Sequence, residues 1–150
     1  MTENINFDIY QTLHSVSRNM HHLAHYIGNQ QGEMQDLGRT LNFIADNDAC
    51  TVKDLADYFG IKSSSATVKV GKLVDQGYLI KTRSTEDLRA FNLSLTSEGT
   101  IKKNQINKNT EGIVEDIFDD LSDNQKAVFL DELKQINQRL VNKRGSEKAK

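Results

Sequence analysis

The chain has 150 residues, a length that suits one compact domain rather than two independent ones. Its formal net charge of −2 excludes a uniformly basic coat for nucleic acid, and its single cysteine, Cys50, excludes an intramolecular disulfide framework. No apolar run approaches the ~20 residues that span a bilayer, and residues 1–7 do not form a signal peptide. We therefore expect a soluble, cytoplasmic protein with no membrane partner.

Two helices are predicted before the central part of the chain. The segment from Ile5 to Ile27 has apolar residues at helical spacing, namely Ile9, Leu13, Val16, Met20, Leu23 and Ile27. A break is predicted over Gly28–Gly32. A second apolar stripe follows, made of Leu37, Leu41, Ile44 and Ala45, and a polar turn over residues 46–48 ends this helix.

The next stretch predicts two short helices around a tight turn. Thr51 with Asp54 three residues later is a helix-start signal, and Gly60 marks the end of that helix. The run Ser63-Ser64-Ser65 predicts a cap for the following helix, whose apolar side holds Ala66, Val70, Leu73 and Val74. This is a helix-turn-helix, a motif whose second helix can enter a DNA major groove.

A β-hairpin is predicted directly after the second helix. Residues 78–83 and 90–95 have strand character, and the polar segment Ser84–Arg89 between them predicts a charged tip. A hairpin in this place is a wing. We therefore predict a mainly α fold of the α+β class, a winged helix-turn-helix.

Two helices are predicted after the wing. Thr96 caps the first, with Gly99 at a small cost, and the polar stretch 102–112 predicts an exposed or loosely helical middle. Ser122 and Gln125 form a capping box for the last helix, whose inward side is predicted to hold Val128, Phe129, Leu133, Ile136 and Leu140. A flexible tail is predicted over residues 143–150.

Four short motifs, in order and correctly spaced, carry a resemblance to a known family. They are Leu55-Ala56, Leu73 to Gly77, Asp87 to Ala90, and Leu95 to Gly99. With them the chain resembles the MarR family of bacterial transcription regulators. The resemblance implies a single domain over residues 1–150, with a winged helix-turn-helix over about 37–96 and dimerisation helices over about 5–30 and 97–142. It also implies a homodimeric repressor on a pseudo-palindromic operator, modulated by a small-molecule effector.

The residues expected to meet double-stranded DNA lie on the face of the second motif helix opposite its apolar side. Short hydroxyls suit its amino end, where backbone N–H groups attract phosphate, and lysines reach a phosphate or a guanine edge. Val68 can meet a thymine methyl, although the family usually has a basic or polar residue there. The predicted contacts on this helix are Ser63, Ser64, Ser65, Thr67, Val68, Lys69 and Lys72.

In the wing, Arg89 is expected to enter a minor groove and sense its width. Asp87, two residues earlier, is expected to orient the Arg89 guanidinium by charge-assisted hydrogen bonds. Lys81 and Arg83 on the preceding strand are expected to contact phosphates. Leu88 stands where the family often has a second arginine, which predicts a weaker electrostatic grip.

No catalytic residue, metal or cofactor is expected. His21 and His25 share a helix face at i, i+4, but later helices offer no histidine or cysteine to complete a metal site. Cys50 is expected to be a buried structural residue rather than an oxidant sensor, because Asp46 and Asp48 raise the pKa of a nearby thiol. The sequence contains no nucleophile–base pair, paired carboxylates or phosphate-binding glycine loop, so an enzyme is not expected.

Two alternatives stay open at this point. The terminal helices either join two subunits or fold back on their own domain. The chain either regulates transcription on DNA or is a winged-helix module that binds protein without DNA, a reading favoured by Val68, Leu88 and a pI of about 6.1.

Overall fold

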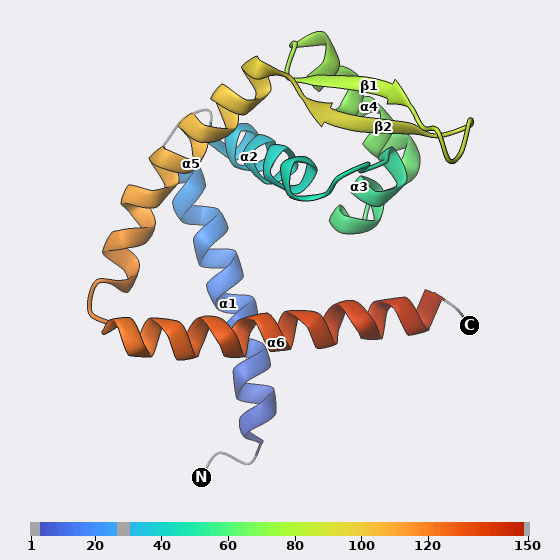
Figure 1. Ribbon diagram of the computed structural model, residues 1–150. Coiled ribbons are helices and arrows are strands. Elements are labelled where there is room, and N and C mark those ends of the chain that lie inside the picture. Colours follow the sequence, from blue (N-terminus) through green and yellow to red (C-terminus); the bar gives the residue numbers. More distant parts are fainter. Residues whose placement is uncertain (1–3, 27–30, 149–150) are drawn as a thin grey trace. The chain divides into compact units, whose positions relative to one another are not determined.

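The structure is a computed structural model that describes residues 4–26 and 31–148. Its elements in chain order (Figure 1) are α1 (Ile5–Tyr26), α2 (Gln31–Asp46), α3 (Val52–Phe59), α4 (Ser63–Asp75), β1 (Leu79–Arg83), β2 (Phe91–Leu95), α5 (Ser97–Phe118) and α6 (Asp123–Lys148). They form two compact units, whose boundary lies inside α5 between Lys108 and Asn109. The predicted mainly α fold with one small antiparallel sheet is confirmed. None of the described helices has the length and apolar character needed to cross a membrane.

Helix α3 begins and ends where the sequence predicts. The backbone N–H of Thr51 donates to the Asp54 carboxylate at 2.9 Å, and the N–H of Asp54 donates to the Thr51 hydroxyl at 3.2 Å. This reciprocal pair satisfies backbone donors that the first turn of a helix leaves unpaired. At the other end Gly60 has φ +64°, a left-handed conformation that glycine adopts without a Cβ clash.

Helix α4 begins one residue earlier than a serine cap requires. Its N-cap is Lys62, which makes no side-chain cap hydrogen bond, and Ser63, Ser64 and Ser65 all lie within the first turn. The prediction that one of these serines caps the helix is therefore wrong. The tight turn after Gly60 already gives Lys62 the extended backbone of an N-cap, so the chain becomes helical before the serines.

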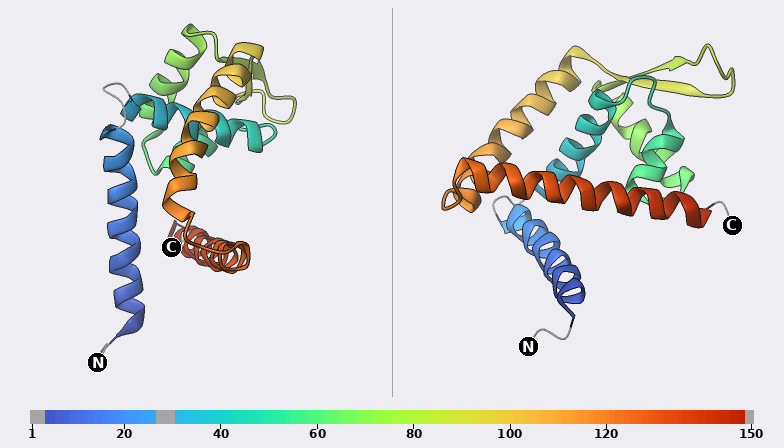
Figure 2. Two further views of the ribbon diagram at one scale, coloured as in Figure 1. Left: turned by 90° about the vertical axis from the view of Figure 1, so that its left-hand side faces the viewer. Right: turned by 60° about the horizontal axis from the view of Figure 1, so that its bottom comes forward.

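Strands β1 and β2 pair antiparallel and form the predicted wing. Their register runs from Leu79 opposite Leu95 to Arg83 opposite Phe91. The N–H of Leu93 also donates to the carbonyl of Cys50 at 2.7 Å, just before α3. The base of the wing is thus fixed to the start of α3, while the tip projects away from the helices in every view (Figure 2).

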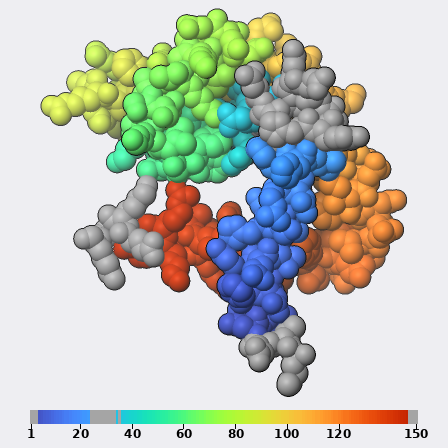
Figure 3. Space-filling model, turned by 180° about the vertical axis from the view of Figure 1, so that it is seen from behind, coloured from blue at the N-terminus to red at the C-terminus, as the bar shows by residue number. Residues whose placement is uncertain are grey.

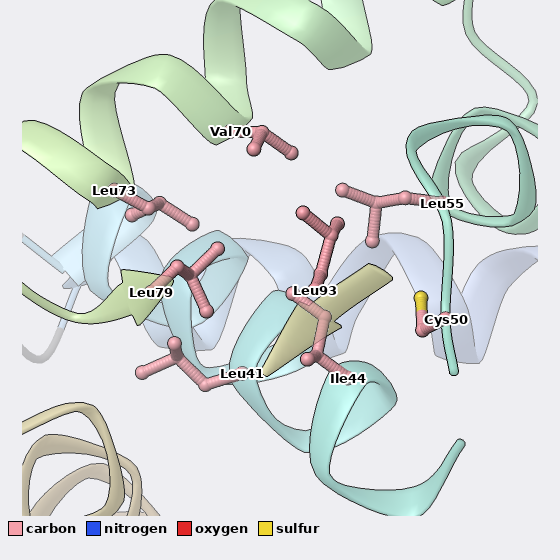
Figure 4. Close-up of a cluster of buried hydrophobic side chains, with 8 residues drawn as sticks. All are labelled: Leu41, Ile44, Cys50, Leu55, Val70, Leu73, Leu79 and Leu93. Carbon is pink, nitrogen blue, oxygen red and sulfur yellow. The ribbon is translucent and has the colours of Figure 1, made fainter. Parts of the chain in front are cut away.

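One hydrophobic core joins the helix-turn-helix to the wing. Its buried side chains come from α2, the start of α3, α4 and both strands (Figure 4), and they are Leu41, Ile44, Cys50, Leu55, Val70, Leu73, Leu79 and Leu93. Fully burying one such aliphatic side chain contributes about 1.5–3 kcal/mol. Because α4 inserts Val70 and Leu73 into this core, its rotation about its own axis is fixed.

The start of α5 is bound to the start of the wing. The Thr96 hydroxyl accepts a hydrogen bond from the N–H of Gly99 at 2.9 Å and donates to the carbonyl of Gly77 at 2.6 Å. This confirms Thr96 as the cap. Gly99 lies so close to the wing that a Cβ at this position would lie 2.1 Å from the carbonyl oxygen of Tyr78. The glycine is therefore required by packing, which the sequence analysis did not foresee.

The polar middle of α5 is a continuous helix, and it is not loose where it meets α2. Ile106 is buried and contacts Gly38 closely. Asn42 and Asn107 exchange two amide hydrogen bonds, at 2.8 and 3.0 Å. These contacts fix the first part of α5 on the helix-turn-helix.

Helices α1 and α6 expose many apolar side chains. On α6, Val128, Phe129 and Leu140 are exposed, and Leu133 and Ile136 are half-buried. The prediction that these five residues face inward is wrong, because no described part of the chain covers them. On α1 the exposed apolar residues are Ile5, Phe7, Ile9, Tyr10, Val16 and Met20.

Several predicted boundaries differ from the structure. Gln31 and Gly32 are helical, while residues 27–30, which hold most of the predicted break, lie outside the described residues. The capping box of α6 is confirmed, since the Ser122 N–H donates to the Gln125 side chain at 2.9 Å and the Gln125 N–H returns to the Ser122 hydroxyl at 3.3 Å. Helix α6 then continues to Lys148, beyond the residue where a tail was expected to begin.

Replacing Gly99 by alanine should destabilise the winged unit, because the new methyl group would overlap the Tyr78 carbonyl. We expect a loss of about 1–3 kcal/mol in the free energy of unfolding. The matched control is Gly71→Ala in α4, where a Cβ meets nothing within 4 Å and helix propensity should add up to about 1 kcal/mol. Urea unfolding followed by circular dichroism at one protein concentration measures both. Equal stability of the two variants would contradict the packing account.

Candidate nucleic-acid interface

The outward face of α4 is the first part of the candidate interface. Its exposed side chains are Ser63, Ser64, Ser65, Thr67, Val68 and Lys72, all of which the sequence analysis assigned to DNA. Val68 is 61% exposed. The Thr67 hydroxyl donates to the carbonyl of Ser63 at 2.8 Å, whereas the serines take no part in capping. The face is small, polar and cationic around one aliphatic side chain.

Lys69 differs from the other predicted contacts. Its ammonium forms an ion pair with Asp36 of α2 and lies 4.3 Å from the centre of the Phe59 ring of α3. Arg39 of α2 places its guanidinium 5.1 Å from the same ring. The expectation that Lys69 reaches freely toward DNA does not fit this geometry, because its charge is already neutralised within the chain. Lys69 instead connects three helices of the winged unit.

A groove of about 820 Å³ opens beside this face. Apolar and cationic side chains line it along α2, α4 and the first part of α5, and they are Met34, Asp36, Leu37, Ser65, Val68, Lys69, Lys72, Leu73, Gln76, Tyr78 and Lys102. The sequence analysis assigned no ligand-binding residues. Met34, Asp36 and Lys102 are far from α4 in the sequence, so spacing along the chain gave no signal for the groove.

The tip of the wing is the second part of the candidate interface, and hydrogen bonds fix its shape. The buried Ser84 hydroxyl accepts from the N–H groups of Glu86 and Asp87 at 3.2 and 3.3 Å. The Asp87 carbonyl accepts from the N–H of Ala90 at 2.9 Å, which closes a β-turn with Leu88 and Arg89 at its corners. In the space-filling view (Figure 3) the tip projects beyond the surface of α3 and α4.

Asp87 has a different role from the one predicted. Its carboxylate accepts a hydrogen bond from the backbone N–H of Arg89 at 2.9 Å. The short aspartate side chain reaches the amide two residues on, as is usual at the first position of such a turn. The prediction that Asp87 holds the Arg89 guanidinium is therefore not observed, and the Arg89 side chain is exposed. Lys81 and Arg83, on β1, are exposed as well.

Cys50 is buried, with 2% of its surface exposed, as predicted for a structural cysteine. Burial, and secondly the Asp54 carboxylate, raise the pKa of its thiol from 9.0 to about 11. The predicted direction is correct, but the acidic neighbour is Asp54 rather than Asp46 or Asp48. At neutral pH the thiol is protonated and inaccessible, which argues against oxidant sensing through this residue.

No three histidine, cysteine or acidic side chains are grouped as metal ligands in the part of the chain that the structure describes. The side chains of His25 and Glu33 lie outside that part. The winged unit thus presents an exposed helix face, a groove and a rigid wing tip, and its described side chains serve recognition better than catalysis.

Comparison with known proteins identifies relatives of this arrangement. Residues 38–90, from α2 to the wing tip, match the model of the MarR family. The transcriptional regulator YwhA of Bacillus subtilis, a helix-turn-helix protein, is 25% identical over 93 residues, which cover 62% of this chain and 67% of YwhA.

Solved structures share the whole fold. A MarR family protein from Bacillus stearothermophilus has a TM-score of 0.76 at 16% identity, with 93% of this chain and 98% of that chain covered. FabT of Streptococcus pneumoniae, solved in complex with DNA, has a TM-score of 0.68 at 21% identity, with 91% and 98% covered. PcaV of Streptomyces coelicolor, solved with its natural ligand, has a TM-score of 0.55 at 21% identity, with 69% and 73% covered.

The raised pKa of Cys50 predicts a pH dependence of stability. The unfolded thiol ionises near pH 9 and the folded thiol near pH 11, so the stability due to this group is fully present below pH 9. It should be lost as the pH rises from about 9 to about 11. Urea unfolding at a series of pH values should show this loss in the wild type. In Cys50→Ala the loss over the same range should be smaller, and parallel curves would contradict the assignment.

Proposed function

Because the chain belongs to the MarR family of winged helix-turn-helix transcriptional regulators, we propose that it binds specific double-stranded DNA and represses transcription. Members of this family are regulators and not enzymes. The chain acts in the cytoplasm on this proposal, where the DNA of a bacterial cell lies. The observation that carries the proposal is the outward face of α4, which is held by a buried face yet serves little purpose inside the chain.

The dimensions of α4 suit the major groove, which admits an α-helix. Ser64 and Ser65 at its amino end can donate to phosphates or base edges, next to backbone N–H groups that already favour anions. Val68 can meet a thymine methyl, and Lys72 a phosphate or guanine. Lys69 is left out of this set, because leaving Asp36 and Phe59 would cost its ion pair and its contact with the ring.

The wing supplies the second contact. Arg89 at the corner of a rigid turn can enter a minor groove, where an arginine responds to the negative potential of narrow A·T-rich DNA. Lys81 and Arg83 on β1 can neutralise phosphates on the way to the tip. The DNA complex of FabT, which has the same fold, supports DNA as the partner of this scaffold.

A homodimer is proposed as the binding form. The exposed apolar residues of α1 and α6 need a cover that the described chain does not provide, and a second copy can supply it. A twofold dimer presents two α4 helices to half-sites about one DNA turn apart, which requires a pseudo-palindromic operator. The alternative that these helices fold back on their own domain is not supported by their exposure.

Regulation by a small ligand is proposed at the groove beside α4. A ligand there would touch Val68 and Lys72 of the proposed DNA face, so ligand and DNA would compete for, or displace, the same helix. The structure of PcaV with its natural ligand shows that a regulator of related fold accepts an effector. Relief of repression by the ligand then follows from its preference for the unbound state.

The proposal is tested by selecting duplexes from a random library with the purified full-length chain and sequencing them. A regulator should enrich a pseudo-palindrome, and its affinity should fall steeply as the salt concentration rises, because bound phosphates release counterions. Failure to enrich any sequence, together with weak and salt-independent binding, would favour the alternative of a winged-helix module that binds protein.

The two α4 lysines should behave differently. On a selected duplex, Lys72→Ala should weaken binding and reduce the slope of log K against log salt by about one unit, the value for one lost phosphate contact. Lys69→Ala should leave that slope unchanged and instead lower the melting temperature, because it removes the ion pair with Asp36. Titrations at four salt concentrations and thermal unfolding separate the two effects. A slope that falls equally in both variants would return Lys69 to the DNA.

The dimer is tested on α6 without truncating the chain. Phe129→Glu with Leu140→Glu changes two exposed positions, so each subunit should keep its helices, whereas an interface formed by them should dissociate. Light scattering coupled to size exclusion should show a dimer for the wild type and a monomer for the double variant, with DNA affinity lost as well. Asn137→Glu, an exposed polar site on the same helix, is the control. A double variant that remains dimeric would place the interface elsewhere.

A further inference from the structure

The tip of the wing presents one apolar and one cationic side chain side by side. Leu88 and Arg89 occupy the two corner positions of the turn that the Asp87 carbonyl and the Ala90 N–H close at 2.9 Å. Asp87 braces the turn from within through its bond to the Arg89 amide. The two corner side chains are therefore carried on a preformed backbone and point away from the body of the wing.

Leu88 has no part in holding the fold together. It is 69% exposed, more than any other large apolar side chain among the described residues. The turn is held by the Ser84 hydroxyl, the Asp87 carboxylate and backbone bonds, none of which needs a leucine at the corner. An apolar side chain in this place is useful only to a partner that enters into contact with the tip.

We propose that Leu88 determines the base preference of the wing, by favouring A·T over G·C pairs where the tip enters the minor groove. This inference rests on the proposed DNA-binding function. The floor of the minor groove carries only acceptors at A·T pairs, whereas each G·C pair adds the guanine N2 amino group, a donor. A leucine offers no acceptor, so packing it against a G·C pair leaves that donor desolvated and unpaired.

The contributions of the two corner residues differ in kind. Arg89 is attracted by the potential of the groove, and its loss removes a charge from the interface. Leu88 contributes by excluding water from the sugar walls and the groove floor, which involves no counterion. The salt dependence of binding thus separates them, because only a lost charge changes the slope.

The test uses one duplex selected by the wild-type protein, prepared in two forms that differ only in A·T or G·C pairs at the flanks where the wing lies. Leu88→Ala should lose about tenfold in affinity on the A·T form, as expected for removing an aliphatic contact, and little on the G·C form. Its salt slope should equal that of the wild type. Leu88→Gln should bind the two forms about equally, because its amide oxygen can accept from the guanine amino group.

Two further variants complete the design. Arg89→Ala should reduce the salt slope by about one unit on both forms. Thr85→Ala, an exposed change in the same loop but outside the turn, should bind both forms like the wild type. The inference is overturned if Leu88→Ala keeps the wild-type preference between the two forms, or if it reduces the salt slope. Failure of the wild type to select any duplex would instead overturn the proposed function itself.

Discussion

The rotational setting of α4 is the constraint on which the rest of the molecule depends. A helix turns by 3.6 residues, so burying Ala66, Val70 and Leu73 decides which side chains are left outside. The same core contains Leu79 and Leu93, which fix the base of the wing. One set of apolar contacts therefore positions both surfaces that we assign to DNA. A recognition helix free to rotate could not present a constant set of side chains to a base sequence.

Local features of this fold could be predicted from the sequence because the partners lie within a few residues of each other. Thr51 with Asp54, Ser122 with Gln125, and the left-handed Gly60 are all confirmed. The buried face of α4 and the strands of the wing follow from periodicity in the same way. These signals require only the chemistry of one turn or the alternation of one strand.

The features that the sequence did not reveal depend on contacts between distant segments or on competition for one side chain. Nothing in the spacing indicates that Asp36 takes the charge of Lys69, since the two are 33 residues apart. Gly99 has the pattern of a tolerated helix glycine until the Tyr78 carbonyl is placed against it. Asp87 chose a backbone amide over a guanidinium. Periodicity also marked the apolar residues of α6 but could not show whether their own chain covers them.

The central claim is that the outward face of α4 and the tip of the wing, and not the Lys69 side of the helix, meet DNA. Backbone amide shifts of the isotope-labelled protein, recorded on titration with a selected duplex, test it most directly. The account predicts the largest changes at Ser64, Ser65, Val68 and Lys72 and over residues 84–90, with Asp36 and Phe59 little affected. Large changes confined to α2 and α3, with α4 and the wing tip unmoved, would contradict it.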